Sequence, residues 1–168
     1  PEVDLVLGVS QYPMLPRAIE EALAGKRPSY CAPESTVLCG ERVLTTAPYT
    51  AYVRIADGCD NRCAYCIIPD VRGPIRSRAL EDVRREALAL GAAGYREVVL
   101  TGIHLASYGR DFKDGTSLLD AIEAVCAAPG VQRVRLGSLE PRVATQAFVE
   151  ALGALPQLCP QFHLALQS

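Results

Sequence analysis

Three cysteines lie close together in this chain, Cys59, Cys63 and Cys66, in the spacing Cys-x3-Cys-x2-Cys. They follow a short apolar segment, so we expect them on a loop at the end of a strand. Thiolates on one tight loop can bind three irons of a cubane iron-sulfur cluster. Because no fourth cysteine follows nearby, the last iron would keep an open position for a small molecule. The spacing therefore predicts a reactive site.

Closely spaced cysteines are also typical of structural zinc sites, but such sites close with four protein ligands. The two histidines, His104 and His163, lie far from the cysteine loop in sequence. The remaining cysteines form no Cys-x2-Cys pair: Cys31, Cys39, Cys126 and Cys159. A secreted disulfide framework is disfavoured, because seven cysteines in 168 residues is an odd number and no signal peptide is seen. A zinc-binding module is thus the non-enzymatic alternative, and the cysteine usage favours a reducing compartment, the cytoplasm.

The composition is typical of a soluble protein with an apolar core, with 49% hydrophobic and 21% charged residues. No apolar run approaches the roughly 20 residues that a membrane-spanning helix needs. The formal net charge of −2 gives no general attraction to nucleic acid phosphates. Charge therefore neither supports nor excludes an RNA partner.

Strand and helix patterns alternate from residue 49 onward. Strands are expected at 51–55, 97–101, 132–136 and 162–166, with helices at 80–90, around 118–125 and around 148–152. Before them, a strand is expected at 3–7, a helix at 15–23, and a connection over 28–48 with a short extended stretch at 43 and 44. Repeated strand-helix units predict an α/β fold with parallel strands. The cysteine loop and residues 102–104, 138–140 and 167–168 all follow strands, so they should gather at the carboxyl edge of the sheet.

The cysteine loop resembles the radical S-adenosylmethionine (SAM) enzymes, whose signature is this spacing with an aromatic residue, here Tyr65, before the last cysteine. Residues 58–69 and 72–78 are similar to the methylthiotransferase pattern GCxxxCxxCxIPxxRGxxRSR. Residues 100–104, 108–109 and 138–141 look like the branch that modifies threonylcarbamoyladenosine in tRNA. The isopentenyladenosine branch usually has Gly-Gln-Asn where residues 102–104 read Gly-Ile-His, and residues 163–168 match the family's His-x-x-x-Gln-Ser motif.

The resemblance implies a partial parallel (β/α) barrel of the radical SAM type, with about four of the six strand-helix units present. It implies three parts: residues 1–27, the end of an N-terminal α/β methylthiotransferase domain; 28–48, a linker; and 49–168, the N-terminal part of the radical SAM domain. Because the chain opens on Pro1 and stops inside a motif, we expect an internal piece of a longer protein.

The same resemblance implies a transferase that adds a methylthio group to position 2 of the adenine of threonylcarbamoyladenosine in tRNA. A 4Fe-4S cluster would cleave SAM to a deoxyadenosyl radical, with electrons from a donor such as a flavodoxin or ferredoxin. A second 4Fe-4S cluster is expected in the full-length protein on ligands outside this chain, so the fragment alone should not complete the reaction. The alternatives are a methylthiotransferase acting on isopentenyladenosine tRNA or a ribosomal protein, and another radical SAM enzyme.

The resemblance also implies roles for single residues. Cys59, Cys63 and Cys66 would ligate the cluster, and SAM contacts are expected from Tyr65, Thr101, Gly102, His104, Ser138, Glu140, Gln167 and Ser168. The residues leave alternatives open: a hydrogen bond to main chain for His104, and a place at a helix start for Glu140. Arg72, Arg76 and Arg78 follow the loop and could form a positive patch for a phosphate or carboxylate, or remain solvated.

Overall fold

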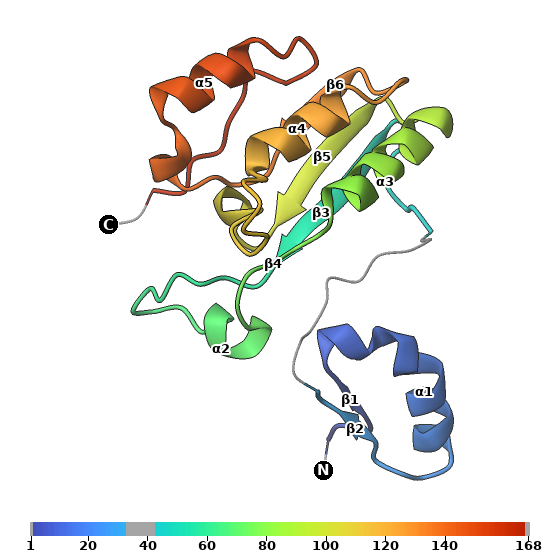
Figure 1. The fold of residues 1–168 in the computed structure, drawn as a ribbon. Coiled ribbons are helices and arrows are strands. Elements are labelled where there is room, and N and C mark those ends of the chain that lie inside the picture. Colours follow the sequence, from blue (N-terminus) through green and yellow to red (C-terminus); the bar gives the residue numbers. More distant parts are fainter. Residues whose placement is uncertain (1, 33–42, 167–168) are drawn as a thin grey trace. The chain divides into compact units, whose positions relative to one another are not determined.

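The computed structural model describes residues 2–32 and 43–166 and divides the chain into two compact units, residues 1–38 and 39–168 (Figure 1). In the first unit, strand β1 (Val6–Leu7) pairs in parallel with β2 (Ser29–Tyr30). Between them, a 3-10 turn, η1 (Val9–Met14), leads into helix α1 (Leu15–Leu23), as the helical spacing predicts. No helix within the described ranges is long and apolar enough to cross a membrane.

Two details of this region differ from the expectations. The strand expected at 3–7 is only two residues long, and residues 29 and 30, expected in the connection, form its partner. The cause is a short parallel ladder, in which the Val6 and Gly8 amides donate to the Pro28 and Tyr30 carbonyls at 3.0 and 2.8 Å. The extended stretch expected at 43 and 44 forms no strand.

The second unit is built on a four-stranded sheet in the order β4-β3-β5-β6. Strands β3 (Thr50–Asp57), β5 (Glu97–Gly102) and β6 (Arg133–Leu136) are parallel and joined by helices α3 (Leu80–Ala92) and α4 (Leu118–Cys126). Helix α5 (Gln146–Gly153) follows β6. The short β4 (Arg76–Ser77) runs antiparallel to the end of β3. This arrangement confirms the partial parallel α/β barrel.

The prediction of a regular strand at 162–166 is wrong. Leu164 forms only an isolated parallel bridge to Leu139. The other side of β6 is contacted by residues 157–159, since the Val134 amide donates to the Gln157 carbonyl and the Cys159 amide donates to the Val134 carbonyl, both at 2.8 Å. The segment at 162–166 lies beyond these residues and contacts Leu139, whose amide donates to the His163 carbonyl and whose carbonyl accepts from the Ala165 amide.

The core lies between the sheet and helices α3 and α4, which pack on each other in Figure 1. Val53, Ile55, Val98, Leu100 and Val134 are fully buried on the strands. Each such side chain contributes about 1.5–3 kcal/mol on burial. The strands therefore form a rigid base, and their carboxyl ends hold the loops that carry the chemistry-bearing residues.

A buried carboxylate closes the cysteine loop at its base. Asp57, only 2% exposed at the end of β3, accepts hydrogen bonds from Arg72 Nε and Nη2 at 3.2 and 3.0 Å. Arg54 Nη1 reaches the same carboxylate at 3.2 Å. Arg72 ends the short helix α2 (Ile68–Arg72), which follows the cysteines. This cluster, called the Asp57 clamp (Asp57, Arg54 and Arg72), ties the entry of the loop to its exit.

The packing of α3 gives a first prediction. A Cβ atom on Gly91 would lie 2.1 Å from the Pro129 carbonyl oxygen, whereas one on Gly153, at the end of α5, would meet nothing within 4 Å. Gly91→Ala should therefore lower the free energy of unfolding by about 1–3 kcal/mol through overpacking. Gly153→Ala, the matched control, should leave it unchanged or raise it by up to about 1 kcal/mol. Urea denaturation of both variants checks this, and equal midpoints would contradict it.

The clamp gives a second prediction. Asp57→Asn keeps the shape of the side chain but removes the charge that faces Arg72 and Arg54, and it should cost about 2 kcal/mol of stability. The expected cost is below that of a fully buried pair because both arginines retain some contact with water. Asp70→Asn, on the exposed face of α2, is the control and should change stability by less than about 0.5 kcal/mol. Equal losses in the two variants would rule out a special role for Asp57.

Candidate functional site

The cysteine loop leaves β3 through a turn that only glycine can make. Gly58 has a φ of +72°, and a Cβ atom there would lie 1.9 Å from the Pro74 carbonyl oxygen. The Cys59 amide donates to the Gly73 carbonyl at 3.1 Å, and the Ile75 amide donates to Asp60 Oδ1, also at 3.1 Å. The incoming and outgoing arms of the loop therefore lie directly against each other.

The three thiols differ in their surroundings. Cys59 is buried, Cys66 is half-buried and Cys63 is exposed. The Cys66 amide donates to the Cys63 carbonyl at 2.9 Å, so a tight turn separates these two cysteines. Burial raises the pKa of the Cys59 thiol, which favours its neutral form until a metal displaces the proton. The loop thus presents one buried thiol and two that solvent can reach.

The donor set fits an iron-sulfur cluster. Across residues 2–32 and 43–166, no three His, Cys, Asp or Glu side chains surround a point where one metal ion could bind. A cubane cluster makes a different demand, because each of its irons takes its own thiolate. Cys59, Cys63 and Cys66 supply three thiols on one loop, two of them reachable from solvent. Cys126 is a separate, buried core thiol, and burial raises its pKa to about 11.

His104, just beyond the end of β5, joins three loops of the carboxyl edge. Its Nδ1 lies 2.6 Å from Ser107 Oγ, in the 3-10 turn η2 (Leu105–Ser107). Its Nε2 lies 3.0 Å from Glu140 Oε2, beyond β6, and 3.1 Å from Asn61 Nδ2, in the cysteine loop. A hydrogen bond from His104 to the main chain was the alternative expected from the sequence, but the partners of its ring nitrogens are side chains. The structure therefore brings His104 and Glu140 together beside the cysteine loop.

The other residues expected to contact SAM occupy several positions. Thr101 lies in β5 and its hydroxyl donates to the Val53 carbonyl at 3.4 Å, while Gly102 ends the same strand. Ser138 Oγ lies 2.8 Å from His163 Nδ1. Tyr65 is 76% exposed on the cysteine loop. Gln167 and Ser168 lie outside the described residues.

Glu140 has both features considered for it. It precedes the 3-10 turn η3 (Pro141–Val143) as its N-cap residue, although its side chain makes no capping hydrogen bond there. Its Oε2 faces His104, and its Oε1 lies 3.2 Å from Arg142 Nε. The carboxylate is thus at the start of the turn and also part of the edge cluster.

The three arginines after the cysteines have partners within the chain. Arg72 belongs to the Asp57 clamp, and Arg78 is buried, with Nη1 donating to Glu86 Oε2 and to the Arg54 carbonyl. Arg76 Nη1 donates to the Arg72 carbonyl at 2.7 Å. Anion binding by these arginines stays a prediction, and their observed contacts hold the loop's exit in place.

Asp57, Asn61 and Ser107 were not singled out from the sequence. Asp57 carried a usable signal, because an acidic residue at the end of an apolar strand needs a buried cationic partner. Asn61 and Ser107 carried none, since both are ordinary loop residues whose partner, His104, is 43 and 3 residues away.

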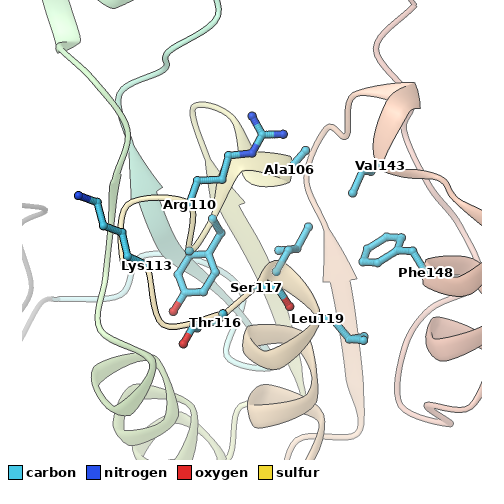
Figure 2. Close-up of a pocket in the computed structure, with 12 residues that line it drawn as sticks. Ala106, Arg110, Lys113, Thr116, Ser117, Leu119, Val143 and Phe148 are labelled. Carbon is cyan, nitrogen blue, oxygen red and sulfur yellow. The ribbon is translucent and has the colours of Figure 1, made fainter.

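Two cavities lie near this edge. One of about 400 Å³ lies between the loop after η2 and the η3-α5 segment, and Figure 2 shows Arg110 and Lys113 on one side with Val143 and Phe148 on the other. The loop that lines it is joined to β4, because the Ser77 amide donates to Asp111 and the Gly109 amide donates to Ser77 Oγ. The second, of about 480 Å³, is apolar and lies between α5 and residues 155–164.

Comparison with known proteins places these features in a family. A model of the radical SAM superfamily matches residues 53–168. The ribosomal protein uS12 methylthiotransferase RimO of Desulforudis audaxviator is 39% identical over 171 residues, and that of Clostridium tetani is 36% identical over 169. The tRNA-2-methylthio-N(6)-dimethylallyladenosine synthase of Nitratidesulfovibrio vulgaris is 36% identical over 178 residues.

These matches cover 99–100% of this chain, which itself spans 38% of the length of each of the three relatives. Their names describe methylthiotransferases for a ribosomal protein and a methylthio-forming enzyme for tRNA, and none of the three names threonylcarbamoyladenosine. Radical SAM proteins use a 4Fe-4S cluster and SAM, and methylthiotransferases carry a second cluster. With the family model covering most of its length and the three cysteines on the loop after β3, the chain belongs to the radical SAM superfamily.

Proposed function

We propose that this chain is the cluster-bearing part of a methylthiotransferase that modifies position 2 of the adenine of threonylcarbamoyladenosine in tRNA. The observation that carries the proposal is the three-cysteine loop at the carboxyl edge of a radical SAM barrel. The choice of substrate rests on the Gly-Ile-His sequence at 102–104. The names of the relatives favour a second candidate, methylthiolation of ribosomal protein uS12.

The first unit fits this proposal as the end of an N-terminal methylthiotransferase domain. Its β1-α1-β2 unit is a parallel α/β arrangement, although its regular structure reaches Tyr30 rather than residue 27. In the longer protein, that domain would carry the second cluster. We place the protein in the cytoplasm, where a flavodoxin or ferredoxin supplies electrons.

In the proposed site, Cys59, Cys63 and Cys66 hold the cluster. A cluster held there would supply the one-electron reduction of SAM. The chain's own residues do the positioning: Gly58 and the Asp57 clamp fix the loop on β3. Thr101 and Ser138 would offer hydroxyl oxygens, and Gly102 a backbone without a side chain, at the strand ends for the SAM methionine and sugar groups. Tyr65, exposed on the cysteine loop, would pack its ring against the adenine of SAM or shield the cluster.

Anaerobic reconstitution tests the cluster. The chain, given iron and sulfide, should turn brown, retain about four irons, and release deoxyadenosine from SAM under a strong reductant. Cys63→Ala and Cys66→Ala should each lower the yield of deoxyadenosine at least tenfold, because each removes an iron ligand. Cys31→Ser is the control, since this exposed thiol lies in the first unit. A colourless chain that is saturated by zinc alone would refute the enzyme and favour the zinc-binding module.

The substrate is tested on the full-length protein. The protein is incubated separately with tRNA carrying threonylcarbamoyladenosine, tRNA carrying isopentenyladenosine, and ribosomal protein uS12. We expect the mass gain of a methylthio group only on the tRNA that carries threonylcarbamoyladenosine. Modification of uS12 would replace the tRNA proposal with the second candidate and leave the cluster assignment intact.

A further inference from the structure

The cavity of about 400 Å³ is bordered on one side by residues 109–116, a loop whose two ends lie against each other. Gly109 has a φ of +86°, and a Cβ atom there would lie 2.0 Å from the Thr116 carbonyl oxygen. Just before the loop, the buried Tyr108 packs edge-on against Phe112, with ring centroids 5.8 Å apart. These contacts hold the backbone of the 109–116 loop in place without a ligand.

The two acids of this loop are occupied by the chain's own backbone. Asp111 Oδ2 accepts a hydrogen bond from the Ser77 amide at 2.8 Å, and Asp114 Oδ1 accepts one from the Thr116 amide at 2.9 Å. The second contact lowers the pKa of Asp114, so this carboxylate stays charged at neutral pH. Neither acid borders the cavity.

The two cations of the loop, Arg110 and Lys113, border the cavity instead, and both are exposed. Across the part of the chain that the structure describes, neither side chain forms an ion pair or a hydrogen bond with another residue. Lys113 also has a φ of +57°, the single positive φ outside glycine among the described residues. This conformation is strained for a residue with a side chain, and such strain is concentrated at functional sites.

The wall of the cavity opposite the loop is apolar and is formed by Val143 and Phe148. In Figure 2 the Phe148 ring extends from α5 toward the loop that carries Arg110. Cations opposite an aromatic ring are typical of a site for a nucleotide, because the base stacks on the ring while Lys and Arg neutralise the phosphate. A volume of about 400 Å³ also lies in the range of pockets that hold small molecules.

We propose that this cavity binds one nucleotide of the RNA substrate, with Arg110 and Lys113 contacting its anionic group and Phe148 packing against its base. The inference rests on the proposed function for the identity of RNA as the substrate. Two groups of that RNA carry the required chemistry: a backbone phosphate and the carboxylate of the threonylcarbamoyl substituent. Both present anionic oxygens to the same donors.

Binding of tRNA to the full-length protein, followed by fluorescence anisotropy over a range of salt concentrations, tests the site. Arg110→Gln and Lys113→Gln should each raise the dissociation constant about fivefold, because each removes one cation from the cavity. Lys113→Gly also removes the cation but relieves the backbone strain. It should weaken binding as much as Lys113→Gln, while its urea midpoint stays at or above that of the wild type.

The same titration with tRNA that lacks the threonylcarbamoyl group identifies the anion. Equal weakening on both tRNAs, with the slope of log K against log salt reduced by about one for each cation, assigns the contact to a phosphate. Weakening only on the modified tRNA assigns it to the carboxylate. Either result supports the site.

Arg84→Gln is the matched control, since it removes an exposed cation of α3 that faces Glu81, and it should leave the dissociation constant unchanged. Wild-type affinity in the Arg110 and Lys113 variants would overturn the proposal, as would an equal loss in Arg84→Gln. A wild-type protein that binds neither tRNA would refute the proposed function itself and this site with it.

Discussion

A single buried negative charge organises the candidate site. Asp57 lies at the end of β3, directly after the fully buried Ile55 and Ala56. An unpaired carboxylate would be costly in this position. Arg72 can satisfy it only if the chain returns after the cysteines, so the charge draws the loop's exit back to its entry. Gly58 permits that return by letting the two arms of the loop touch backbone to backbone. The path of the loop thus follows from one charge and one glycine.

The parallel sheet then decides which other residues can take part. Because β3, β5 and β6 run in the same direction, the residues that follow them emerge at one edge. Asn61, His104 and Glu140 are separated by 43 and 36 residues, yet one imidazole touches all of the loops concerned. The buried apolar strands supply the rigidity that such contacts need.

The sequence predicts much of this fold and only part of the site. Apolar patterns predict β3, β5, β6 and their crossover helices, because burial on a parallel sheet leaves a clear pattern of apolar residues. The strand expected at 162–166 fails because strand formation depends on a neighbour's free backbone, which apolar spacing does not encode. The arginines' preference for carboxylates is predictable, but the partners of Arg72 and Arg78, Asp57 and Glu86, emerge only in the folded chain.

The small strand β4 has a mechanical consequence. Ser77 is hydrogen-bonded through its amide and its hydroxyl to the segment at 109–111, which lines the cavity of Figure 2, while its neighbour Arg76 pairs with Asp57 in the sheet. The cavity wall and the exit of the cysteine loop are therefore joined through Ser77 and Arg76, the two residues of β4.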